Sequence, residues 1–162
     1  MAVVLAIDPG SQFSGWVVYN GATAGIRAHD RTENEQLLDQ LRRLGDELEV
    51  VVIEWTAPRG MPASAELFET LWWAGRFAEA ARDKRVERVN RLEVKRHLCG
   101  STASKDTNVH AALIDRFGGV GGKAAAVGVK ASPGPLYGVK RDVWAALGVA
   151  VTWTDQYEEA AA

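Results

Sequence analysis

Cysteine is almost absent from this sequence, since Cys99 is the only one in 162 residues. A single thiol cannot form an intramolecular disulfide, so a disulfide-stabilised fold is excluded and a reducing compartment is expected. Long apolar runs are missing too. The opening run stops at Asp8, short of the ~20 residues that cross a bilayer, and it lacks the basic flank of a signal peptide. We therefore expect no membrane partner.

Net charge is also small, at −2, and taken alone this argues against a nucleic-acid partner. The distribution of the charges points the other way. Residues 1–81 carry 6 basic and 12 acidic side chains, whereas residues 82–141 carry 13 basic and 5 acidic ones. Residues 142–162 carry 4 acidic side chains and none that is basic. The basic stretch is either a local phosphate-binding surface or a chance division of a solvated surface.

Apolar runs, turn signals and helical periodicity give the element order β-β-β-α-β-α-β-α-α. The expected strands are residues 2–7, 15–19, 22–28, 50–53 and 86–90. The expected helices are residues 32–48, 64–84, 104–117 and 140–153. This order predicts an α/β fold of the ribonuclease H-like type, a mixed five-stranded sheet with helices on both faces. Residues 1–153 would form one domain and residues 154–162 a frayed acidic tail.

Two stretches carry more specific structural expectations. Residues 32–35 have the pattern of a capping box, in which a hydroxyl and a carboxylate each satisfy a backbone amide at a helix start. Residues 118–138 hold seven glycines and two prolines. This composition predicts a long mobile loop, which would either contact a partner or be an unstructured surface excursion.

Acidic residues end two of the expected strands. Asp8 follows the first apolar run directly, and Glu54 ends Val-Val-Val-Ile-Glu. We expect these strands to be neighbours, so that the two carboxylates repel each other unless a cation lies between them. Hard divalent ions such as Mg²⁺ prefer oxygen ligands of this kind. The alternative is two strand-end acids that simply face water.

A third acid begins the last apolar helix. Asp142 is followed by a small-residue face, Ala145, Ala146, Gly148 and Ala150, that would let the helix pack closely on the sheet. Close packing would bring Asp142 near Asp8, although an acid in a first helical turn is often only a cap. The sequence therefore predicts that three distant carboxylates converge on one metal site.

These motifs, taken together, resemble the RuvC-type Holliday junction resolvases, and most of all their phage-like branch. The resemblance rests on Leu5-Ala6-Ile7-Asp8-Pro9-Gly10-Ser11 with Gly15, on Val52-Ile53-Glu54, and on the helix that begins at Asp142. Residues 94–100 and 104–106 are similar to that family's basic region and the helix after it. The resemblance covers residues 3–153 and implies that the protein acts in the cytoplasm of a bacterial or phage-infected cell.

The resemblance implies phosphodiester hydrolysis with two Mg²⁺ or Mn²⁺ ions per active site, held by Asp8, Glu54 and Asp142. Lys105 lies at the position where that family has a basic residue near the scissile phosphate. The family usually has a second acid one turn after the position of Asp142, where this sequence has Ala145. Asp106 is the candidate substitute.

The resemblance also implies a four-way or branched DNA partner. The candidate DNA-binding residues are Arg59, Arg76, Lys95, Arg96, Lys140 and Arg141. The apolar arc of the helix that holds Leu67, Leu71 and Trp72 predicts a homodimer interface, because paired cuts in a two-fold symmetric junction need a symmetric dimer. A buried core face would produce the same pattern.

Three other functions fit part of the pattern. A YqgF-like RNA-processing nuclease shares the Asp-Pro-Gly opening. An actin-like phosphotransferase would use Asp8 and Gly10 on nucleotide phosphates, but it needs two such domains. A non-catalytic protein that binds DNA junctions is consistent with Ala145.

Overall fold

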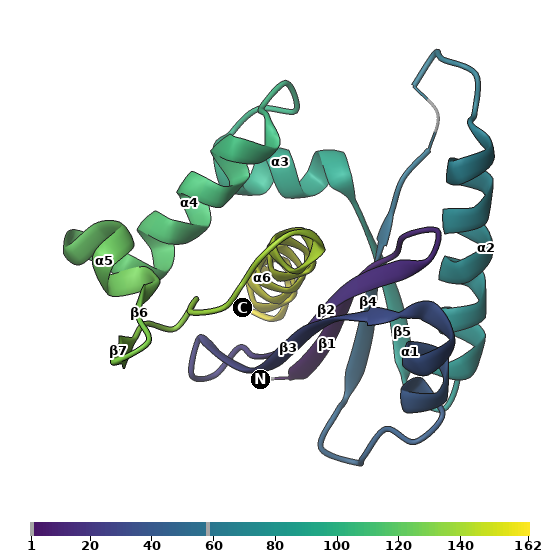
Figure 1. Ribbon diagram of the computed structural model, residues 1–162, viewed down its shortest axis with the longest axis horizontal. Helices are drawn as coiled ribbons and strands as arrows, with labels where there is room; N and C mark the ends of the chain where they lie inside the picture. Colours follow the sequence, from purple (N-terminus) through teal and green to yellow (C-terminus); the bar gives the residue numbers. More distant parts are fainter. Residues whose placement is uncertain (1, 58) are drawn as a thin grey trace.

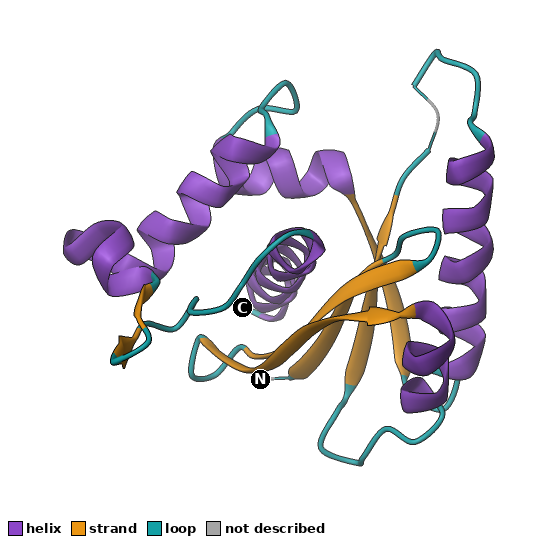
Figure 2. Cartoon of the chain, viewed as in Figure 1, coloured by secondary structure: helices purple, strands orange, loops and turns teal. Residues whose placement is uncertain are grey.

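Five strands form one mixed sheet in the order β3-β2-β1-β4-β5 (Figures 1 and 2). The computed structural model describes residues 2–57 and 59–162, without the side chains of residues 158, 159 and 161. The strands are β1 (Val3–Asp8), β2 (Phe13–Asn20), β3 (Gly25–Glu33), β4 (Val50–Trp55) and β5 (Arg85–Asn90). The first three pair antiparallel, and β4 pairs parallel with β1 and β5. The predicted mixed sheet and the pairing of the first and fourth strands are confirmed.

Helices cover both faces of the sheet. One face packs against α1 (Asn34–Leu41) and α2 (Ala65–Ala80), and α6 (Asp142–Ala161) lies on the other face (Figure 1). On the α6 side, α3 (Arg91–Cys99) and α4 (Asp106–Gly118) form an arm that packs on α6. No helix in residues 2–57 and 59–162 is long and apolar enough to span a bilayer.

Alternation along the strands separates two apolar cores. Val4 and Ala6 of β1, with Val50 and Val52 of β4, belong to the core under α6. Their neighbours in the chain, such as Ile7 and Ile53, belong to the core under α1 and α2. Successive side chains of a strand point to opposite faces, so each strand contributes to both cores.

The first helix begins and ends differently from the prediction. Strand β3 continues through Glu33, and the described geometry shows no side-chain cap at the start of α1. The Thr32 hydroxyl instead accepts a hydrogen bond from the Trp16 indole nitrogen at 2.8 Å, so the predicted capping box is wrong. The helix ends at Leu41, and Leu48 reaches the core from the following loop.

Helix α3 was not predicted, although its end signals stand in the sequence. Asn90 and Glu93 form a capping box at its start, and Gly100 ends it in the left-handed conformation with φ of 75°. The many charges of residues 91–99 obscure the apolar periodicity that would otherwise indicate a helix. Only Val94 of this helix is buried.

The glycine-rich stretch is ordered, so the expectation of a mobile loop is wrong. It forms η1 (Gly119–Gly121), α5 (Gly122–Ala126) and a small hairpin of β6 (Gly128–Val129) and β7 (Ser132–Pro133). Ala126 and Leu136 are fully buried, and the amide of Leu136 donates to the carbonyl of Ala126. A Cβ on Gly134 would lie 2.4 Å from two backbone oxygens, so this glycine permits close packing.

The last helix continues through residues 154–161, which we expected to fray. Asp155 explains why this end of α6 stays helical, because its carboxylate contacts side chains of both α3 and α4. Arg116 of α4 donates to both of its oxygens, at 2.7 and 2.6 Å, and His97 Nε2 of α3 lies 2.7 Å from Oδ2. Burial acts to raise the pKa of Asp155, but these hydrogen bonds outweigh burial and hold the pKa below its usual value.

Candidate active site

Strand alternation places Asp8 and Glu54 on the same face of the sheet. Asp8 comes two residues after Ala6, and Glu54 two residues after Val52, and both of these side chains belong to the core under α6. The register pairs Ile7 with Ile53, the residues just before the two acids. The side chain of Glu54 is 9% exposed. Two carboxylates from neighbouring parallel strands thus lie together at one sheet edge, as predicted.

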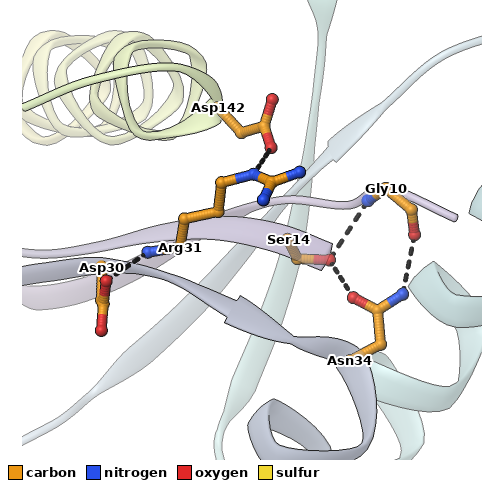
Figure 3. A network of polar contacts seen from close by, with 6 residues as sticks. All are labelled: Gly10, Ser14, Asp30, Arg31, Asn34 and Asp142. Atoms are coloured by element: carbon orange, nitrogen blue, oxygen red, sulfur yellow. Dashed lines mark hydrogen bonds and ion pairs between the residues drawn. The ribbon is translucent and has the colours of Figure 1, made fainter. Parts of the chain in front are cut away.

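The start of α6 reaches this edge because β2 has a glycine there. A Cβ on Gly15 would lie 2.4 to 2.7 Å from the backbone and Cβ of Asp142. Arg31 pairs with Gly15 across β2 and β3, and its Nε donates to Asp142 Oδ2 at 2.7 Å (Figure 3). The Arg31 guanidinium also lies 4.5 Å above the Phe13 ring. Asp142 is therefore held at the sheet edge by an ion pair.

A buried hydrogen-bond network fixes the turn that follows Asp8. The Ser14 hydroxyl accepts from the amide of Gly10 at 3.1 Å and donates to Asn34 Oδ1 at 2.7 Å. Asn34 Nδ2 donates in turn to the carbonyl of Gly10 at 2.9 Å (Figure 3). Ser14 is 0% exposed and Asn34 is 1% exposed, so these contacts form in a low-dielectric setting that strengthens them. The turn is therefore rigid.

The acids line one pocket of about 270 Å³, enclosed by the strand ends and by α3, α4 and α6. Its lining residues are Asp8, Glu54, Arg91, Val94, Lys95, Asp106, Val109, His110, Arg141, Asp142 and Ala145. The structure thus brings together all three predicted carboxylates, the candidate substitute Asp106 and the position Ala145 that lacks the usual acid.

Electrostatic repulsion in the pocket acts most strongly on Asp8. Burial raises the pKa of Asp8 well above its usual value, and the charge of Glu54, a hydrogen bond with Glu54 and the charge of Asp142 raise it further. The charge of Arg91 acts in the opposite direction. A carboxyl group in this state favours a proton or a cation beside it.

Two basic side chains of α3 pair with Asp106 on the far side of the pocket. Arg91 Nη2 donates to Asp106 Oδ1 at 2.5 Å, and Lys95 Nζ lies 3.7 Å from the same oxygen. Arg91 Nη1 also lies 3.8 Å from Glu54 Oε1. Arg91 therefore joins an acid of the sheet to an acid of α4.

Two of the four carboxylates offer oxygen ligands of the kind that a divalent cation prefers. Asp8 and Glu54 offer adjacent oxygen ligands, the type that Mg²⁺ and Mn²⁺ prefer. Asp142 and Asp106, however, face arginines, and among the described residues no group of three or more His, Cys, Asp and Glu side chains is arranged to hold an ion.

Most of the predicted DNA-binding residues lie outside the pocket. Lys95 and Arg141 line it, whereas Arg59, Arg96 and Lys140 are exposed and do not line it. Lys105, the basic residue expected near the scissile phosphate, is also exposed and outside the lining. Arg76 lies on the opposite side of the sheet, where it pairs with Glu35 at 3.4 Å and covers the Trp73 ring at 4.2 Å. Part of the basic stretch also serves internal contacts, because Arg85 lies over Trp153 and Tyr157.

Two pocket residues, Arg91 and His110, and the Asp142 partner Arg31 were missed by the sequence reasoning. Arg31 was hidden because its contact with Asp142 spans 111 residues of sequence. Arg91 was treated only as one of many basic residues, although the sequence already indicates a helix that begins at Arg91, directly after the capping residue Asn90. His110 stacks on Trp144 at 4.8 Å, and burial lowers its pKa despite the charge of Asp106. The i, i+4 spacing of Asp106 and His110 was the available signal.

The strand order and the position of α6 define the α/β class with a ribonuclease H-like fold. Neither a protein-family model nor a curated protein sequence matches the chain significantly.

Within that class the chain is similar to RuvC from Thermus thermophilus. One structure of that protein matches with a TM-score of 0.64 at 20% identity, covering 97% of this chain and 96% of the other. A second, described as T. thermophilus RuvC in complex with a Holliday junction substrate, matches with a TM-score of 0.65 at 19% identity, covering 99% and 97%. These similarities establish the predicted fold.

Proposed function

We propose that this protein is a divalent-cation-dependent endonuclease of the RuvC type. It would resolve Holliday junctions or other branched DNA by paired cleavage, in recombination, repair or phage DNA processing. The observation that carries this proposal is the convergence of Asp8, Glu54 and Asp142 on one pocket. The similar RuvC structure that holds a Holliday junction substrate supports the same class of substrate here.

The reaction would join a water oxygen to phosphorus and break a phosphorus–oxygen bond of the DNA backbone, with a proton passing from water to the leaving oxygen. Asp8, Glu54 and, after leaving Arg31, Asp142 would hold the cation. A bound Mg²⁺ or Mn²⁺ polarises a phosphoryl oxygen and lowers the pKa of water. The rigid turn after Asp8 keeps its carboxylate in place, and His110, whose pKa is lowered, is available as a proton acceptor.

Basic residues around the pocket would orient the DNA. Lys95, with a side chain 14% exposed, points at Asp106 inside the pocket and is better placed than the exposed Lys105 to contact the reacting phosphate. Arg141 lies at the pocket, and Lys105, Arg96, Lys140 and Arg59 would contact neighbouring phosphates. We assign no DNA contact to Arg76, because it lies on the other side of the sheet.

The outer face of α2 supports a homodimer. Phe68 and Trp72 are 63% and 64% exposed, and Leu71 and Trp72 line a groove of about 740 Å³ beside α1. Exposed aromatic side chains beside a groove are typical of interaction surfaces. A second copy is the occupant that a two-fold symmetric junction requires, since each protomer would supply one active site.

A synthetic four-way DNA junction offered with Mg²⁺ or Mn²⁺ tests the activity. We expect symmetric nicks by the wild-type chain, and junction binding without nicks by Asp142→Asn. Binding without cleavage by the wild type would contradict the catalytic proposal and favour a junction-binding protein. Cleavage of structured RNA in preference to the junction would instead favour the YqgF-like alternative.

Analytical ultracentrifugation tests the dimer. We expect Trp72→Ser to shift the protein from dimer to monomer. Val129→Ser is the matched control, because Val129 is 63% exposed but lies on the hairpin beside α5. A wild-type monomer, or equal effects of the two substitutions, would contradict the α2 interface.

A further inference from the structure

Arg91 occupies the centre of the acidic site. It lines the pocket that holds Asp142 and Ala145, and it also lines a second pocket that reaches Asp8 and Glu54 from the side of α2. Its guanidinium contacts Asp106 at 2.5 Å and lies 3.8 Å from Glu54, and its charge acts on Asp8 as well. One fixed positive charge therefore interacts with three of the four acids.

The position of Arg91 is built into the fold. Arg91 is the first residue of α3, directly after β5. Asn90 Oδ1 accepts from the amide of Leu92 at 2.8 Å, and Glu93 Oε2 accepts from the amide of Asn90 at 2.7 Å. This capping box fixes the backbone from which Arg91 extends, and the side chain is only 34% exposed. The guanidinium is thus held in place before any ligand binds.

The ligands for a second cation are missing where Arg91 lies. Ala145 offers a methyl group to the pocket, and the one additional acid, Asp106, is paired with Arg91 and Lys95. An arginine remains charged at any working pH, so it supplies a permanent positive charge that needs no ligands.

We propose that Arg91 takes the electrostatic place of a second metal ion. Each protomer would then bind a single divalent cation at Asp8, Glu54 and Asp142, and the Arg91 guanidinium would contact the phosphate of the bound DNA. Its planar N–H groups can contact two phosphate oxygens at once, whereas here they face one oxygen of Asp106 and one oxygen of Glu54. This inference rests on the proposed nuclease function and changes its expected ion count from two to one.

Electron paramagnetic resonance of Mn²⁺ added to the protein tests the ion count. We expect one Mn²⁺ per wild-type protomer, without the spin coupling that two ions ~4 Å apart would show. Arg91→Met frees Glu54 and Asp106, so we expect a second Mn²⁺ and a spin-coupled signal. Arg91→Lys keeps the charge and should retain one ion, while junction cleavage slows because the paired N–H contacts are lost.

Arg27→Met is the matched control, because Arg27 is exposed on β3 and does not line the pocket. It should bind one Mn²⁺ like the wild type, and circular dichroism should show that all variants fold. A coupled Mn²⁺ pair in the wild type, with or without junction DNA, would overturn the inference, and so would a single ion in folded Arg91→Met. Absence of junction cleavage by wild-type protein with one Mn²⁺ bound would instead refute the nuclease function, so the two failures are distinguishable.

Discussion

The two faces of the sheet use the same apolar strands but differ in polar chemistry. On the α6 face, Asp8 and Glu54 continue the rows of Val and Ala side chains into a pocket that α3 and α4 enclose. On the α2 face, Ile7 and Ile53 pack in a core with Phe77 and Leu37. Exposed aromatic side chains of α2 lie outside this core. The difference shows how a shift of one residue along a strand decides between a pocket carboxylate and a core side chain.

Charge also distinguishes the faces. Four carboxylates share the pocket on the α6 face with arginine and lysine side chains. On the α2 face the described ion pairs, such as Arg42 with Asp39 and Arg82 with Glu79, are exposed and of a kind that contributes little to stability. We therefore expect substitutions on the α6 face to change chemistry and those on the α2 face to change self-association or packing.

The largest expected effect follows from removing the central carboxylate. Asp8→Asn should lower junction cleavage by a factor on the order of 10³, because the amide is a poor cation ligand. The fold should survive, since a buried amide avoids the repulsion with Glu54. Nicking assays with a four-way junction measure the first effect, and thermal unfolding measures the second.

Asp39→Asn is the matched control for that substitution, because Asp39 is an exposed acid of α1 on the other side of the sheet. Equal loss of cleavage in the two variants would contradict the division of roles between the faces. Full cleavage by Asp8→Asn would remove the proposed site.

Gly15→Ala should have the second largest effect. The added Cβ would meet the Asp142 backbone at 2.4 Å, so α6 must move away from the sheet. We expect a loss of about 1–3 kcal/mol in the free energy of unfolding and weaker cleavage. Urea denaturation measures the stability, and an unchanged midpoint would show that α6 does not need this close approach.

Asp155→Asn tests the link between α6 and the arm of α3 and α4. It removes charge-assisted hydrogen bonds with Arg116 and His97, and we expect a loss of about 1–2 kcal/mol at neutral pH. Because the folded-state pKa of Asp155 is lowered, this contribution is present above the unfolded pKa of about 3.9 and is lost as pH falls through the folded value. Denaturation of both proteins from pH 7 to pH 3 should show the difference shrinking, and a constant difference would contradict the ion-pair origin.

The smallest effect is expected on the α2 face. Gly75 lies within α2, and a Cβ added there meets no atom within 4 Å. Gly75→Ala should stabilise the helix by about 0.5–1 kcal/mol, in contrast to Gly15→Ala. Thermal unfolding in a Trp72→Ser background separates this gain from any effect on self-association. A loss of stability there would contradict the open outer face of α2.

Local patterns predicted the five strands and the pairing of the first and fourth strands. The apolar run before Asp8, the Val-Val-Val-Ile run before Glu54 and the small-residue start of α6 each form the expected element. Residues 118–138 show the limit of local patterns. Glycines indicate a mobile loop by composition, yet Leu136 and Ala126 are buried and the chain is ordered around them.

The candidate site was predictable in its carboxylates but not in their partners. Asp8, Glu54 and Asp142 stand out because each follows or begins an apolar element. Arg31 and Arg91 do not, because a basic residue on a strand or at a helix start is ordinary, and their contacts join segments far apart in the chain.

The sequence by itself determined which residues alternate along each strand, so that Asp8 and Ile7 point to opposite faces of β1 and Glu54 and Ile53 to opposite faces of β4. Only the tertiary structure decided that Asp142 pairs with Arg31 across Gly15, and that Arg91 lies between Glu54 and Asp106 in the same pocket as Ala145. The physical reason is that the two features depend on residues at different separations along the chain. Alternation is set by the geometry of neighbouring residues, whereas charge pairing depends on which distant segments the folded chain brings within a few ångströms.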